Sequence, residues 1–91
     1  MAVSVIIPQV LRELTAGEDE VRLEARTVGQ ALDELEVRFP GMKRKICRGD
    51  DALHGFVNLY VNDEDVRFLN GLATELKDGD VVTILPMIAG G

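Results

Sequence analysis

The chain has 91 residues, of which 46% are apolar and 29% charged, and its formal net charge is -6 with a pI near 4.6. This length gives one small domain with a single core. The acidic balance argues against a nucleic-acid partner, because a phosphate backbone is bound by a basic stripe. The basic residues Lys43, Arg44, Lys45 and Arg48 do cluster, but aspartates follow directly, and we interpret the cluster as a solvated loop.

No targeting signal or membrane anchor is visible in the sequence. Residues 1–11 lack the basic start and small-residue cleavage site of a signal peptide. No run approaches the roughly 20 apolar residues needed to span a bilayer. Cys47 is the only cysteine, which excludes an internal disulfide and a multi-cysteine zinc site. We therefore expect a cytoplasmic protein that binds neither membrane nor metal.

The first half of the chain predicts a hairpin followed by a helix. A strand pattern is predicted over 3–7, where Val3, Val5 and Ile7 alternate with Ser4 and Ile6. A second is predicted over 21–25, where apolar residues alternate with polar ones, and a polar turn at 17–20 lies between the two. The helix begins after Thr27, a suitable N-cap, and Gln30 stands three residues later as in a capping box. Pro40 and Gly41 end this helix. Its apolar face is formed by Val28, Ala31, Leu32, Leu35 and Phe39.

The second half predicts shorter elements. In chain order we expect a loop over 42–55 with a short helical turn near 42–47, a strand over 56–61, a tight turn over 62–65, a short returning strand over 66–68, a helical turn at 72–76 and a last strand over 81–85.

This order indicates an α+β domain in which one main helix packs across a mixed sheet of about four to five strands. With the last strand placed centrally beside the first, the arrangement is the β-grasp (ubiquitin-like) fold. We assign residues 1–86 to this domain and residues 87–91 to an extended tail.

The tail ends on two glycines. Gly90 and Gly91 follow the apolar last strand with no polar segment between. A terminal glycine presents a carboxylate on a carbon without a side chain, and a second glycine adds backbone freedom before it. Such an end fits a narrow active site in which a Cβ would clash.

Several stretches together resemble the ubiquitin-like sulfur carrier proteins over essentially the whole chain. They are the run 56–68, the stretch 71–74, the Asp-Gly-Asp turn at 78–80, the strand 82–86 and the terminal Ala89-Gly90-Gly91. The family includes the small subunit of molybdopterin synthase and the thiamine-pathway sulfur carrier. Within it, the run 56–68 is most similar to the actinobacterial carrier that supplies sulfur for cysteine biosynthesis.

The resemblance implies a chemistry centred on Gly91. An E1-like activating enzyme uses ATP to adenylate the Gly91 carboxylate, and a sulfur donor then displaces AMP to leave a thiocarboxylate. In the cysteine branch the acceptor is an aminoacrylate on a pyridoxal-phosphate-dependent synthase, and a metal-dependent peptidase releases the product. Gly90, Ala89, Ile88 and Met87 would thread into partner active sites. The chain itself would bind no cofactor.

The residues also favour a protein cosubstrate over an enzyme. His54 has no recognisable nucleophile–base partners, and Cys47 is interpreted as a packing residue. The acidic cluster 63–65 lacks the spacing of a calcium loop. We therefore assign no catalytic and no metal-binding residue.

Strand alternation over 56–61 suggests a partner surface. Val57, Leu59 and Val61 form the better core set, which places Phe56 and Tyr60 on the outer sheet face. Burial of one of the two under a loop is an equal alternative.

Three other functions remain open at this point. The chain is also compatible with a molybdopterin synthase small subunit, with a modifier joined to lysines through Gly91, and with a plain interaction module. The sequence does not identify the activating enzyme, the sulfur donor, the final acceptor or the oligomeric state.

Overall fold

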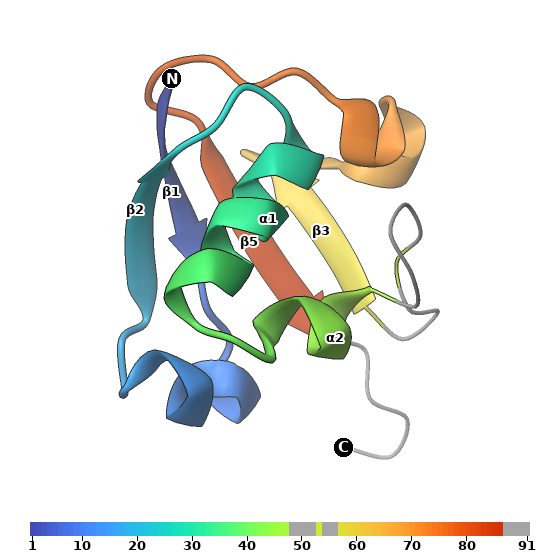
Figure 1. Cartoon of the computed structure of the whole chain (residues 1–91). Coiled ribbons are helices and arrows are strands. Elements are labelled where there is room, and N and C mark those ends of the chain that lie inside the picture. The colour runs from blue at the N-terminus through green and yellow to red at the C-terminus, as the bar shows by residue number, and fades with distance from the viewer. Residues whose placement is uncertain (48–52, 54–56, 87–91) are drawn as a thin grey trace.

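Five strands form one mixed sheet, and helix α1 lies across one of its faces (Figure 1). The computed structural model describes residues 1–47, 53 and 57–86. The strand order is β2-β1-β5-β3-β4, with β5 parallel to β1 and antiparallel to β3. The strands are β1 Ala2–Ile6, β2 Glu20–Glu24, β3 Val57–Val61, β4 Glu64–Asp65 and β5 Val81–Pro86. This topology confirms the predicted β-grasp fold and the central place of the last strand.

Strand alternation divides the sheet into a core face and an outer face. On β5, Val82 and Ile84 are fully buried beneath α1, whereas Thr83 is half-buried and Leu85 is exposed on the opposite face. The core is one apolar cluster contributed by every described strand except β4, together with α1 and α2. Its largest members are Ile7, Leu32, Leu35, Met42, Ile46, Leu59 and Ile84.

Helix α1 spans Val28–Arg38 and begins as the sequence predicts. The Thr27 hydroxyl oxygen accepts a hydrogen bond from the Gln30 backbone N–H at 3.1 Å. The other half of the capping box differs, because Gln30 Oε1 accepts from the N–H of Arg26 and not from that of Thr27. The cap therefore also holds the chain that enters the helix.

The connection from β1 to β2 contains a 3-10 helix, η1 Gln9–Thr15, which the sequence analysis missed. Leu11 and Leu14, three residues apart, both pack against the core. The predicted polar turn follows this helix but ends earlier than expected, because Glu20 already belongs to β2. Gly17 in the turn and Ala16 just before it have positive φ.

The short helix α2, Met42–Ile46, confirms the helical turn expected within the 42–55 segment. The Glu36 carboxylate of α1 accepts hydrogen bonds from the backbone N–H groups of Gly41 and Lys43, at 3.0 and 2.9 Å. These bonds lower the pKa of Glu36. Lys43 also pairs with Asp33, so the basic cluster begins on a helix joined to α1 and not in a free loop. Arg48 lies outside the described residues.

The prediction of a returning strand over 66–68 is wrong. The strand is limited to Glu64–Asp65, and Val66–Phe68 forms a second 3-10 helix, η2. Asp65 ends the strand because its side chain caps η2, accepting from the Arg67 N–H at 2.8 Å. Val66 can then turn into the core, where it is fully buried.

A third 3-10 helix, η3 Gly71–Ala73, lies against the start of α1. The Thr74 carbonyl accepts from the Val28 N–H at 3.0 Å, which satisfies a backbone group at the helix start. Gly29 allows this close approach, since a Cβ there would lie 3.2 Å from the Leu72 carbonyl oxygen.

Asn62 joins the β3–β4 turn to the start of β5. Its backbone is left-handed, with φ 57°, and its side chain donates one hydrogen bond and accepts another. Nδ2 donates to Asp80 at 3.1 Å, and Oδ1 accepts from the Val81 N–H at 3.1 Å. One exposed side chain therefore fixes the position of two turns.

Among the described residues, no helix combines the length and the apolar character needed to cross a membrane; α1, with 11 residues, is the longest.

Candidate functional site

Strand β5 leads directly into the predicted tail. It runs between β1 and β3 and ends at Pro86, which pairs with Val57, at the end of the sheet where α2 lies (Figure 1). The tail residues Met87, Ile88, Ala89, Gly90 and Gly91 lie outside the described residues, and their role stays a prediction. What the structure fixes is the root of the tail, at the end of the central strand.

The outer sheet face carries an apolar surface beside this root. We call it the outer patch and define it as Ile6, Tyr60, Thr83 and Leu85. Thr83 pairs with Ile6 on one side and with Tyr60 on the other, so the three side chains share a face. Leu85 stands two residues further along β5 and is 43% exposed. The patch therefore spans β1, β5 and β3.

Tyr60 occupies the outer face as predicted and is half-buried. Phe56, its predicted companion, lies outside the described residues. Asn58 has the same strand parity as Tyr60 but is only 6% exposed, so the outer face is covered at that position. Alternation alone gave the direction of these side chains but not their exposure.

An ion pair borders the outer patch at the β4 edge. Asp65 is the ladder partner of Tyr60, and its side chain is only 7% exposed. Arg67 Nη2 donates to Asp65 Oδ2 at 2.9 Å, and Arg67 Nε lies 3.3 Å from both carboxylate oxygens. The guanidinium and the Arg67 backbone N–H together lower the pKa of Asp65. The carboxylate is thus held charged next to Tyr60.

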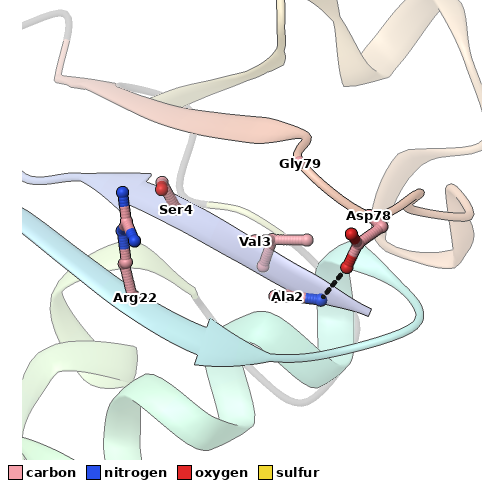
Figure 2. A pocket seen from close by; sticks show the side chains of 6 residues that line it. All are labelled: Ala2, Val3, Ser4, Arg22, Asp78 and Gly79. Atoms are coloured by element: carbon pink, nitrogen blue, oxygen red, sulfur yellow. Dashed lines mark hydrogen bonds between the residues drawn. The ribbon is translucent and has the colours of Figure 1, made fainter.

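Among the described residues, two hollows lie away from the outer patch. The first, about 260 Å³, lies between the start of β1 and the turn that precedes β5 (Figure 2). Asp78 and Arg22 stand at opposite ends of it, and the Asp78 carboxylate already accepts from the Ala2 N–H at 2.9 Å (Figure 2). The second, about 660 Å³ and wide open, lies at the start of α1, where the cap already uses Thr27 and Gln30. Neither hollow brings together groups for catalysis.

The described residues contain no group of His, Cys, Asp and Glu side chains suited to hold a metal. Cys47 is buried at the end of α2, and burial raises the pKa of its thiol. It is therefore a packing residue, as expected. His54 lies outside the described residues.

Sequence reasoning missed the ion pair at the border of this site and three of the four residues of the outer patch, Ile6, Thr83 and Leu85. It placed Asp65 in a turn and did not predict the Asp65–Arg67 pair, whose signal is an acid two residues before an arginine at a strand end. It also named neither Ile6 nor Leu85. Both could have been predicted from the alternation of their own strands once the sheet order was known.

Comparison with protein-family models shows which family the chain belongs to. The family model described as the ThiS family matches residues 5–91, which is nearly the whole chain and includes the tail. The chain belongs to the ThiS family. This membership agrees with the β-grasp sheet described above.

Individual relatives of this ThiS-family chain cover its full length. Sulfur carrier protein CysO of Mycobacterium tuberculosis is 47% identical over 93 residues, with all of both chains aligned. A chain of the crystal structure of the Amycolatopsis orientalis BexX/CysO complex is 50% identical, with a TM-score of 0.93 over 99% of this chain and 100% of that one. Small archaeal modifier protein 1 of Methanosarcina acetivorans is 35% identical, with a TM-score of 0.83 over 99% and 96% of the two chains.

Proposed function

We propose that this chain is a sulfur carrier whose Gly91 carboxylate becomes a thiocarboxylate that donates sulfur for cysteine biosynthesis. The observation that carries the proposal is full-length similarity to CysO, at 47% identity, in a chain that retains the terminal Gly90-Gly91. The chain is a protein cosubstrate and not an enzyme.

The proposed reaction balances in two steps on partner enzymes. In the first, a Gly91 carboxylate oxygen attacks the α-phosphorus of ATP and pyrophosphate leaves, giving an acyl adenylate. In the second, a sulfur nucleophile attacks the acyl carbon and AMP leaves, giving the thiocarboxylate. Sulfur is soft and polarisable, so this anion is a competent nucleophile near neutral pH.

The proposed partners follow the same sequence of events. They are an E1-like adenylating enzyme that supplies the ATP chemistry, a sulfur donor, a pyridoxal-phosphate-dependent cysteine synthase that accepts the sulfur, and a metal-dependent peptidase that releases the product. The A. orientalis complex pairs CysO with BexX, which supports the expectation that this chain also acts on a partner protein.

The outer patch is the proposed docking surface for these enzymes. It lies next to the end of β5, so a partner that covers it also receives the tail. Half-buried Tyr60 is a residue type that is enriched in binding hot spots, and exposed Leu85 adds apolar contact area beside it.

Deletion of Gly91 tests the proposal. The shortened chain should melt like the full chain, because Gly91 lies beyond the last strand, and it should accept no sulfur. The measurement is intact mass after incubation with the adenylating enzyme, ATP and a sulfide source, with replacement of one oxygen by sulfur expected in the full chain only. Sulfur on the shortened chain would contradict the proposal.

Similarity to the small archaeal modifier protein favours one alternative, a modifier joined to lysines through Gly91. Lysine-linked adducts in cell extract with ATP would support it. Sulfur transfer from the purified thiocarboxylate form to the aminoacrylate of the synthase supports the cysteine carrier instead, and transfer to a pterin precursor supports a molybdopterin synthase subunit.

A further inference from the structure

Asp65 holds one edge of the Arg67 guanidinium, and the other edge is open to solvent. Asp65 is bonded to Nε and Nη2, and its carboxylate is buried. Arg67 itself remains 58% exposed, and its Nη1 has no hydrogen-bond partner among the residues that the structure describes. A guanidinium has five N–H donors in a fixed plane, so the Nη1 edge still presents donors outward.

The position of this edge links it to the outer patch. Asp65 stands opposite Tyr60 in the β3–β4 ladder, which brings the anchored guanidinium to the border of the patch. Because Asp65 fixes the side chain, little conformational entropy is lost when a partner binds the Nη1 edge. An arginine beside an aromatic residue is also a common composition of binding hot spots.

Charge identifies the chemistry of the partner group. The chain carries a net charge of -6, so an acidic side chain on a partner is repelled unless a local cation receives it. At the opposite edge of the sheet, Arg22 lies between Glu20 and Glu24 on β2 and pairs with Glu20. Arg67 is instead next to the apolar surface, and its Asp65 partner is buried beneath it.

We propose that Arg67 is a specificity-determining residue that binds a carboxylate, an Asp or Glu side chain of the adenylating enzyme, at the border of the outer patch. This inference rests on the proposed function. It adds a charged contact of defined geometry to an otherwise apolar docking surface.

The test is ATP–pyrophosphate exchange by the adenylating enzyme, measured against carrier concentration. Arg67→Gln should raise the KM for the carrier roughly tenfold, the equivalent of one charge-assisted hydrogen bond, with kcat retained. Arg67→Lys should lie between, because an ammonium keeps the charge without the planar fork. Arg22→Gln makes the same charge change on the same sheet face at the opposite edge, and its KM should stay within about twofold of wild type.

A double variant separates recognition from folding. Arg67→Gln alone leaves the buried Asp65 carboxylate without its guanidinium, so a raised KM has a structural explanation as well. Asp65→Asn with Arg67→Gln removes both charges, and on our proposal its KM stays raised although its thermal stability recovers. Recovery of the wild-type KM in the double variant, or an equal rise for Arg22→Gln, would overturn the proposal.

Tyr60→Ser distinguishes this inference from the function on which it rests. A raised KM for Tyr60→Ser with a normal KM for Arg67→Gln would leave the docking surface in place and reject the role of Arg67. Absence of exchange with the wild-type carrier would reject the proposed function, and this inference with it.

Discussion

Replacing Asn62 with alanine tests the turn that joins the β3–β4 connection to the start of β5. Alanine in the left-handed backbone of this position costs about 1–2 kcal/mol. Loss of the two solvent-exposed hydrogen bonds to Asp80 and Val81 adds about 1 kcal/mol. The free energy of unfolding should therefore fall by about 2–3 kcal/mol, which for a domain of this size lowers Tm by roughly 10–20 °C.

Asn62→Gly is the matched variant. It loses the same two hydrogen bonds but adopts φ 57° without strain, and its main added cost is about 0.5–1 kcal/mol of unfolded-chain entropy. Denaturant titrations should rank the proteins as wild type, Gly and Ala in order of falling stability. Equal stability of the Ala and Gly variants would refute the backbone argument, and wild-type stability in both would refute the role of the side chain.

Two further variants test contacts around α1. Glu36→Gln replaces a carboxylate whose pKa is lowered in the folded chain, so the stabilisation it removes is fully present above the ordinary pKa of 4.5 and is lost as pH falls through the folded value. The Tm difference from wild type should be constant from pH 6 to 8 and shrink in acid, and a difference that grows in acid would contradict this sign. Gly29→Ala should destabilise the chain by about 1 kcal/mol in a thermal melt despite the higher helix propensity of alanine, because the added Cβ meets the Leu72 carbonyl oxygen at 3.2 Å; a stabilised variant would show that η3 moves aside.

The fold was predictable to the extent that hydrophobic period and local capping determine it. The period of α1, the Thr27 cap and the alternation of β1, β3 and β5 all lie within a few neighbouring residues, and all are confirmed. The errors occurred where one side chain redirects the backbone. Asp65 stops a strand by capping η2, and this depends on an acceptor that a period-two pattern cannot register.

The candidate site was less predictable, because its parts come from separate strands. Tyr60 was identified from the alternation of its own strand, but the outer patch exists only because β5 brings Thr83 between Ile6 and Tyr60. The Asp65–Arg67 pair is local in sequence, and yet its value depends on the burial of Asp65, which the sequence does not state. Side-chain direction could be predicted, whereas exposure required the assembled sheet.

The central place of β5 has a consequence for the synthesis of the chain. Strand β1 cannot gain its parallel neighbour, nor β3 its antiparallel one, until residue 86 has been made. Before then only the β1–β2 and β3–β4 pairings are available, and insertion of β5 between them joins segments at opposite ends of the sequence. The outer patch forms only when β5 is in place, because Thr83 pairs with both Ile6 and Tyr60. A chain that lacks β5 therefore also lacks the outer patch on which the proposed docking depends.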